Sequence, residues 1–229
     1  MRGLLLLSLP LLRLNSTHFS LAIRLRLGLP PQDDLPAECA CGEDLKSNPD
    51  HFIVCRLLRR TSATTRHDRV LYLLARLSRT VEIATRAEVP LEDQKRPDAN
   101  FYLHNRTIAT DVSIIHPAAA SYCKQAAKIL GAAAIREKEK KRDYSDQALA
   151  EGLDFIPFVL ETFGGFGREA TSLLDLLMDE GSLKGMDTLG GMRARTFITR
   201  ALSICLQGGN ALILQDGCAM TRRAASRNS

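Results

Sequence analysis

The feature that most constrains this chain is a cluster of sulfur and imidazole side chains between residues 38 and 56. Cys39, Cys41, His51 and Cys55 follow the pattern C-x-C-x9-H-x3-C. Thiolate and imidazole groups at such spacing are the usual ligands of a tetrahedral structural Zn²⁺ site. Four protein ligands leave no open position on the metal, so the pattern predicts a structural zinc. The alternative interpretation is a chance cluster of cysteines in a loop.

The residues around these ligands indicate how the ligands converge. Gly42 directly follows the second cysteine, and glycine permits a tight turn at that point. The segment 48–50, Asn-Pro-Asp, is a turn that can cap a helix beginning near His51. On such a helix His51 and Cys55 lie four residues apart and share a face. We therefore expect a compact CCHC knuckle over residues 37–58.

Length and composition allow one core and a small accessory module. The chain has 229 residues, of which 45% are apolar and 25% charged, and this balance excludes an intrinsically disordered chain. Six cysteines are too few for a disulfide scaffold at this length, so the cluster points to a reducing compartment. We interpret the three scattered cysteines, Cys123, Cys205 and Cys218, as small apolar core residues.

Basic residues gather at both ends of the chain. Residues 1–26 carry four arginines and no acid, and residues 191–229 carry six arginines and one acid. The formal net charge of +5 permits a polyanionic partner, and basic ends suit contact with nucleic acid phosphates. The alternative is that these ends are ordinary solvated segments.

The first residues imitate a secretory signal, with a basic start and an apolar run over 1–14. Pro10 and Arg13 interrupt the run, and no small-residue cleavage site follows it. No stretch of about 18 uncharged apolar residues is present, so we expect no membrane span. We predict a leader over 1–36 that contains an amphipathic helix at 19–27. The predicted location is nuclear or cytoplasmic, and the alternative is a secreted protein.

Hydrophobic periodicity predicts the remaining elements. A helix is expected over 66–79 and a strand over 81–89, followed by two strands, 98–104 and 107–115, that turn at Asn105-Arg106. The chain then predicts a helix over 118–144, a strand over 155–161, and helices over 168–178 and 192–206. The order α-β-β-β-α-β-α-α indicates a mixed α/β core.

Two aspartates stand out in the predicted hairpin. Asp98 lies seven residues before Asn105, and Asp111 lies five residues after Arg106. A bulge or a stagger would bring both carboxylates to one end of the sheet. Neighbouring carboxylates repel each other unless a cation lies between them, and Mg²⁺ prefers such oxygen ligands. Taken singly, Asp98 could cap a turn, and Asp111 could be an exposed strand residue.

The predicted helix that follows is strongly charged near its end. Arg136, Lys140 and Tyr144 share one stripe at helical spacing. A lysine beside a metal-bound water can orient that water or stabilise the charge on a phosphate. The alternative is an ordinary charged helix face with ion pairs four residues apart.

These parts, in this order, resemble a known family. A CCHC knuckle is followed by Arg-Pro-Asp, twelve residues, a second Asp, and a helix with Lys-x3-Tyr. This arrangement resembles the restriction-enzyme-like endonuclease domain of site-specific non-LTR retrotransposons, a branch of the PD-(D/E)XK nuclease superfamily. In these elements the domain follows the reverse transcriptase. The resemblance covers roughly residues 19–214.

The resemblance implies a fold and a domain division. It implies a PD-(D/E)XK restriction-endonuclease-like α/β core over residues 62–215, with a mixed sheet flanked by helices and preceded by the knuckle. Residues 216–229 would then be a basic tail. A reverse transcriptase would need an aromatic-x-Asp-Asp strand, which this chain lacks. We therefore expect a domain-sized fragment or a degenerate copy of a longer element.

The resemblance also assigns the site. Asp98 and Asp111 would bind Mg²⁺, and Lys140 with Tyr144 would complete the catalytic set. Ser113 stands where a standard D/E-x-K strand places lysine, so the lysine is expected on the helix. The neighbouring lysines that remain alternatives to Lys140 are Lys138 and Lys141.

The implied activity is a metal-dependent DNA endonuclease that nicks one strand to prime reverse transcription. The expected partner is DNA, with the RNA of the parent element as a second candidate. The alternative is a catalytically inactive, zinc-stabilised remnant that binds nucleic acid. Both readings require zinc, and only the endonuclease requires Mg²⁺ at the two aspartates.

A glycine-rich turn follows the predicted strand 155–161. Gly164, Gly165 and Gly167 could cradle a phosphate at the start of the next helix, or they could allow close packing of strand and helix. No Gly-Lys-Ser/Thr follows, which excludes a nucleotide-binding P-loop, and we favour close packing. His116, after the hairpin, is a second-tier candidate for the site.

Overall fold

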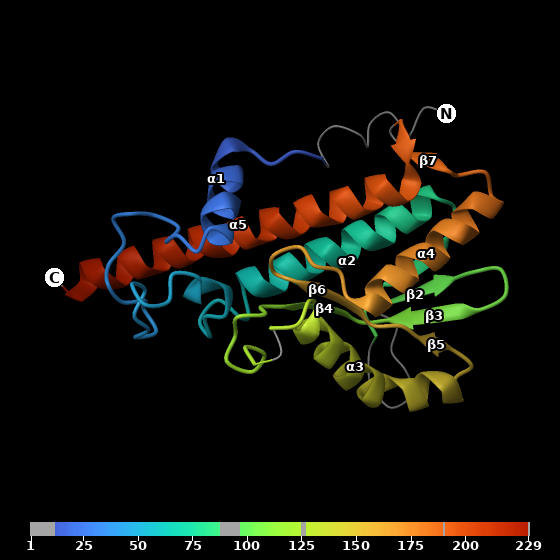
Figure 1. Ribbon diagram of the computed structural model, residues 1–229, viewed down its shortest axis with the longest axis horizontal. Helices are drawn as coiled ribbons and strands as arrows, with labels where there is room; N and C mark the ends of the chain where they lie inside the picture. The colour runs from blue at the N-terminus through green and yellow to red at the C-terminus, as the bar shows by residue number, and fades with distance from the viewer. Residues whose placement is uncertain (1–11, 88–96, 125–126, 190, 229) are drawn as a thin grey trace. The chain divides into compact units, whose positions relative to one another are not determined.

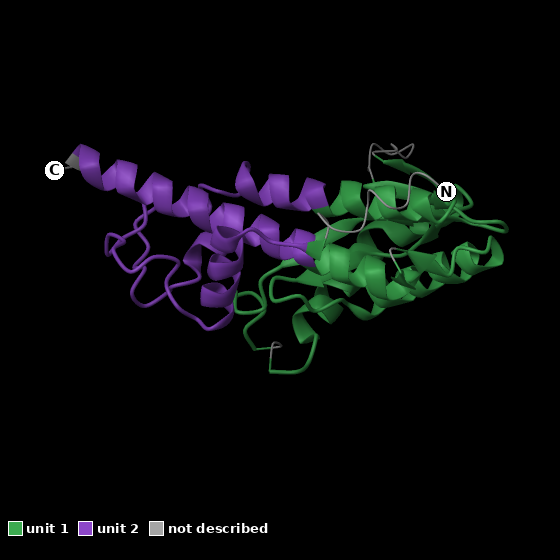
Figure 2. Cartoon of the chain, turned by 90° about the horizontal axis from the view of Figure 1, so that it is seen from above, with its two compact units in different colours: residues 1–12, 70–203 green, residues 13–69, 204–229 purple. Residues whose placement is uncertain are grey.

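The computed structural model describes residues 12–87, 97–124, 127–189 and 191–228. The chain forms two compact units, shown in green and purple in Figure 2: unit 1 comprises residues 1–12 and 70–203, and unit 2 comprises residues 13–69 and 204–229. Two long helices, α2 (Ser62–Thr80) and α5 (Ala194–Asn228), contribute to both units. The expected succession of leader, knuckle, core and tail stays a prediction.

Unit 1 is built around a mixed sheet. Its strands are β1 (Ala84–Ala87), β2 (Ala99–Tyr102), β3 (Thr107–Thr110), β4 (Val112–Ile115), β5 (Asp154–Phe155) and β6 (Phe158–Glu161). The order β1-β2-β3-β5 has antiparallel pairs up to β3, and β5 runs parallel to β3. β4 and β6 form a second parallel pair. The predicted mixed α/β class is confirmed.

The parallel pairs β3–β5 and β4–β6 share one register, because backbone hydrogen bonds continue across the break that separates the two pairs. The Ile156 N–H donates to the Ala109 carbonyl at 3.0 Å, and the Phe158 N–H donates to the Asp111 carbonyl at 2.9 Å. The predicted single strand over 107–115 is therefore interrupted at Asp111. The antiparallel ladder with β2 stops there because the Val112 N–H donates to the side chain of Asp98.

Helices flank this sheet in unit 1. Helix α3 (Gly131–Ala150) packs on β4, β5 and β6, and α4 (Arg168–Leu183) packs on β6. Figure 1 shows α3 on one side of the strands and α4 on the other. Helix α2 buries Val70, Leu74 and Leu77, as its periodicity predicts. A short antiparallel pair, β7 (Thr188–Leu189) and β8 (Met192–Arg193), precedes α5.

Helix α3 begins later than expected. The described part of 118–130 forms turns, with the Ala119 N–H donating to the His116 carbonyl and the Tyr122 N–H to the Ala119 carbonyl. These short-range bonds compete with the helical pattern, and Leu130 enters the left-handed region at φ 56° just before the helix. The helix then runs past Tyr144 to Ala150.

Helix α5 is longer than the expected 192–206 and includes the predicted basic tail. Residues 216–228 are helical and continue the buried stripe with Cys218 and Thr221. The predicted helix end at Leu206 is therefore too early, and residues 216–228 belong to α5. Cys218 is buried as predicted, whereas Cys123 is exposed and was wrongly assigned to the core.

Unit 2 contains α1 (Ser16–Arg26), which begins three residues before the predicted helix. Asn15 caps it, because its side chain accepts the His18 N–H at 2.7 Å. Gly217 of α5 lies directly against Phe52, since a Cβ there would come within 2.4 Å of the ring. The knuckle segment therefore packs closely on α5 within this unit.

Helix α5 is long and apolar enough, by length and composition, to cross a membrane. Of its most apolar window, 61% is buried inside the protein, which is also a property of core helices. Length and composition alone therefore do not assign this helix to a membrane. Most of the apolar run over 1–14, which imitates a secretory signal, lies outside the described residues.

Candidate functional sites

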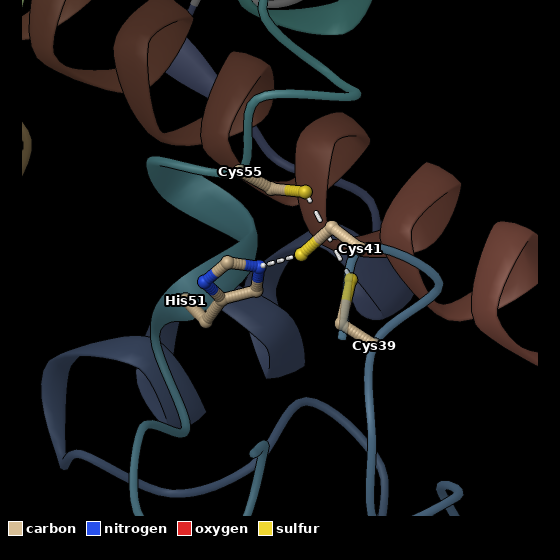
Figure 3. Close-up of side chains that lie close together, drawn as sticks. All are labelled: Cys39, Cys41, His51 and Cys55. Carbon is tan, nitrogen blue, oxygen red and sulfur yellow. Dashed lines mark hydrogen bonds between the residues drawn. The ribbon is translucent and has the colours of Figure 1, made fainter. Parts of the chain in front are cut away.

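The four predicted zinc ligands converge in unit 2, as Figure 3 shows. Their ligand atoms all lie within 4.8 Å of one another. The Sγ atoms of Cys39 and Cys55 are 3.8 Å apart, and Cys41 Sγ lies 3.1 Å from His51 Nε2. A tetrahedron with Zn–S bonds of about 2.3 Å has an edge of roughly 3.8 Å, which matches the Cys39–Cys55 distance. The cluster could hold a metal ion such as zinc.

Two local structures bring the ligands together. The Cys39 N–H donates to the Glu43 carbonyl at 2.8 Å, and the Gly42 N–H donates to the Cys39 carbonyl at 2.8 Å. Gly42 closes this turn at φ 91°, where only glycine is unstrained. On the other side, His51–Ile53 is a single 3₁₀ turn and not the expected longer helix. The reason is that the Val54 N–H bonds back to the His51 carbonyl, three residues away.

The surroundings shift the pKa values of the four ligand side chains. Burial raises the pKa of Cys39 and raises the pKa of Cys55 to about 12. Burial also acts to raise the pKa of Cys41, but the Glu43 backbone and the neighbouring thiols outweigh it and lower that pKa. Burial lowers the pKa of His51, which favours the neutral imidazole that binds metals. A metal must therefore displace protons from the buried thiols, so its affinity depends on pH.

The two predicted metal aspartates come together in unit 1 without a bulge. Ala99 pairs with Thr110, so Asp98 and Asp111 are the residues next to the last pair of the β2–β3 ladder. The expected stagger is wrong because the hairpin turns at His104-Asn105, one residue earlier than predicted, between Tyr102 and its partner Thr107. The Asp98 carboxylate accepts the Val112 N–H at 2.7 Å, which orients it beside the strand break.

Lys140 joins the aspartates from helix α3. Its Nζ lies 2.7 Å from Asp111 Oδ2, and the two side chains are 13% and 7% exposed. Of the two alternatives, Lys138 is exposed, and Lys141 pairs with Glu169 at 2.8 Å. Among the three candidate lysines, Lys140 is the one that contacts the carboxylate.

Tyr144 completes the predicted set, one turn further along α3. Burial raises its pKa to about 12, and the nearby charges of Asp111 and Asp98 act in the same direction. Its ring stacks on Phe155 with centroids 5.0 Å apart, and Lys140 Nζ lies 5.3 Å from its centroid. The tyrosine therefore stays protonated near neutral pH and packs beside the ion pair.

Two further residues belong to this carboxylate cluster. The Ser113 hydroxyl donates to Asp111 Oδ2 at 3.4 Å, and Arg136 Nε donates to Ser113 Oγ at 3.4 Å. Arg136 also pairs with Glu139 at 2.9 Å. The helical stripe Arg136, Lys140, Tyr144 already pointed to Arg136. Alternation along the strand could have identified Ser113, because residues two apart face the same side.

The glycine-rich turn serves close packing. Glu137 of α3 accepts the Glu169 N–H at 2.9 Å, so a carboxylate already occupies the first turn of α4. A Cβ on Gly167 would lie 2.1 Å from Glu137 Oε1, and one on Gly165 would lie 2.7 Å from Leu130. His116, the second-tier candidate, is buried and packs its ring against Phe163 at 5.4 Å.

Comparison with known proteins assigns no family: no protein-family model matches the chain, and no curated protein matches it. The chemistry of the site must therefore be argued from its residues. The carboxylate cluster combines two oxygen ligand groups, a buried cation and a protonated phenol. Because only two of its side chains are acidic, a divalent ion there would need further oxygen ligands from water or a phosphate.

Proposed function

We propose that the chain is a metal-dependent DNA endonuclease that hydrolyses phosphodiester bonds and nicks one strand. The observation that supports this most is the ion pair between Asp111 and Lys140, held at 2.7 Å where the sheet is interrupted. Asp98 lies beside it through its bond to Val112. Carboxylates can hold a divalent metal ion, and an adjacent cation can stabilise the charge that develops when a phosphodiester is hydrolysed.

The resemblance to retrotransposon endonuclease domains adds to this proposal. The order α-β-β-β-α-β expected for the core is the order of α2 to β6, with two strands interrupted. The lysine comes from the helix, while Ser113 occupies the strand position of a standard D/E-x-K motif. We therefore propose a PD-(D/E)XK core of retroelement origin, acting on DNA in the nucleus or cytoplasm, with the element's RNA as a second partner.

Asp98 and Asp111 are the residues that would hold Mg²⁺. Mg²⁺, when bound, activates water and neutralises charge on the phosphate. Lys140 would stabilise negative charge on the attacked phosphate. Tyr144, protonated at neutral pH, would orient the Asp111 carboxylate. The knuckle would hold a structural zinc and take no part in hydrolysis.

The test is nicking of supercoiled plasmid by zinc-loaded protein, with and without added Mg²⁺. Asp98→Asn and Asp111→Asn preserve side-chain shape and should each reduce nicking ~10²–10³-fold, because each removes a metal ligand. Binding to the same DNA in the absence of Mg²⁺ should stay within about twofold of wild type.

The second candidate is a non-catalytic nucleic-acid-binding remnant. The knuckle favours it, because the zinc ligands lie in unit 2 and do not depend on the aspartates. Binding of DNA by the wild-type chain, with no nicking in either Mg²⁺ or Mn²⁺, would refute the endonuclease and leave this candidate standing.

A further inference from the structure

A groove in unit 2 lies between the knuckle and the last turns of α5. It has a volume of about 540 Å³ and is open to solvent. One side is a single face of α5 that carries Asp216, Arg223 and Arg227, and the other side includes Ala40 of the knuckle and Thr61. We propose that this groove binds the phosphate backbone of a nucleic acid. The inference rests on the proposed function, for which it names the surface that holds the polyanion.

The charges of the groove support this assignment. Arg223 and Arg227 are four residues apart on one helix and therefore share a face. Both are exposed, and neither forms an ion pair within the described part of the chain. Arg222, their neighbour, points to a different partner and pairs with Asp34 at 2.6 Å. The acid of the groove, Asp216, accepts the hydroxyl of Ser62.

The shape of the groove suits a polymer backbone. Small side chains, Ala40, Ala219 and Ala224, line it and let a chain approach the protein closely. An open groove can accept a strand that enters and leaves, whereas an enclosed cavity selects a small molecule. Guanidinium groups bind phosphate oxygens in a bidentate manner, so two arginines one turn apart can contact successive phosphates.

The groove also depends on the metal cluster. Ala40 lies between the ligands Cys39 and Cys41, so metal binding fixes one wall of the groove. Removal of zinc should therefore weaken nucleic acid binding. This effect separates the groove from a loose basic surface, which would bind equally well without the metal.

The experiment uses the full zinc-loaded chain carrying Asp111→Asn, without added Mg²⁺, and measures binding of duplex DNA and of single-stranded RNA by fluorescence anisotropy. The double variant Arg223→Gln/Arg227→Gln should reduce the magnitude of the negative slope of log K against log salt by about 2, one for each phosphate contact that is lost. Affinity at ~0.1 M salt should fall roughly 10- to 100-fold for whichever nucleic acid binds.

The matched control removes the same charge from elsewhere: Arg193→Gln/Arg200→Gln, two exposed arginines of unit 1. The proposal would be overturned if this control changed the salt slope as much as the groove variant Arg223→Gln/Arg227→Gln does. It would also be overturned if the groove variant left the slope unchanged. Zinc content and circular dichroism verify that each variant is folded.

The outcomes also separate this inference from the proposed function. If the wild-type chain nicks DNA and the groove variant binds nucleic acid as the wild type does, the groove is not the binding surface and the proposed endonuclease still stands. Reduced binding by the groove variant, together with a wild-type chain that never nicks, would support the groove and refute the endonuclease.

Discussion

The contacts of single residues decide which side chains lie close enough to act together in a reaction. Asp98, Asp111, Lys140 and Tyr144 were all identified from the sequence, and unit 1 brings them to one place. The choice among three lysines could not be made from the sequence, because helical spacing places Lys140 and Lys141 only about 100° apart around the axis. The contact with Asp111 favours Lys140, and this contact depends on how α3 packs on the sheet.

Lys140→Met should reduce Mg²⁺-dependent nicking ~10²–10³-fold, because the variant keeps the aliphatic stem and loses the charge beside Asp111. The matched control is Lys138→Met on the same helix, where the lysine is exposed, and its nicking should stay within about twofold of wild type. Equal losses in both variants would contradict the assignment of the lysine.

Loss of the Lys140 charge should also lower the free energy of unfolding. The Lys140 and Asp111 side chains are both largely buried, so Lys140→Met leaves an uncompensated carboxylate that costs ~3–5 kcal/mol of unfolding free energy. Combining it with Asp111→Asn should recover most of that loss, as measured by urea denaturation. If the double variant is no more stable than Lys140→Met alone, the two side chains do not form a pair in the folded protein.

At the scale of elements, strand and helix types were predictable and their limits were not. The hairpin, α2 and α4 follow from local periodicity. The strand break at Asp111 depends on a side-chain bond from Asp98, and the extension of α5 to Asn228 depends on burial against distant segments. Sequence patterns within one element do not report such contacts.

The junction of α3 and α4 offers a double-mutant test. Gly167→Ala should destabilise the protein by ~1–3 kcal/mol, because the new Cβ would overlap Glu137. In a Glu137→Ala background the same substitution should cost less, since the overlapping carboxylate is gone. Urea denaturation of the wild type, both single variants and the double variant gives this coupling energy. Additive effects would mean that the two residues are not in contact.

Glu137 also predicts a pH dependence. Burial raises the pKa of this carboxyl above its usual 4.5, so the folded state holds the proton more tightly than the unfolded state. Its contribution to stability is therefore full below about pH 4.5 and is lost as the pH rises through the raised pKa. Glu137→Gln cannot titrate, so its stability relative to wild type should increase from pH 4.5 to neutrality. A flat difference across that range in urea titrations would show that burial does not perturb this group.

At the scale of the whole molecule, the division into units was the least predictable feature. The knuckle is local in sequence and was predicted as a module. Its association with α1 and the end of α5 joins residues far apart in the chain, and no pattern within either segment specifies it. The four predicted ligands within the knuckle converge as their spacing predicts, in a cluster that could hold a metal ion such as zinc.

Purified protein should contain one zinc per chain and no disulfide. Chelation should raise hydrogen exchange mainly in residues 13–69 and 204–228, because the metal cluster lies in unit 2. Residues 97–116 of unit 1 should keep most of their protection. Uniform exchange across both units after chelation, or no zinc in protein purified under reducing conditions, would refute a structural zinc confined to unit 2.

The proposed activity depends on a divalent cation that Asp98 and Asp111 share. Replacing Mg²⁺ by Fe²⁺ in zinc-loaded protein, and adding peroxide and ascorbate, cuts the polypeptide beside the bound iron. We predict cuts near residues 98 and 111, read by mass spectrometry, that excess Mg²⁺ suppresses and that Asp111→Asn abolishes. Cuts located elsewhere, or cuts at these positions that persist in Asp111→Asn, would show that the two aspartates do not share a cation.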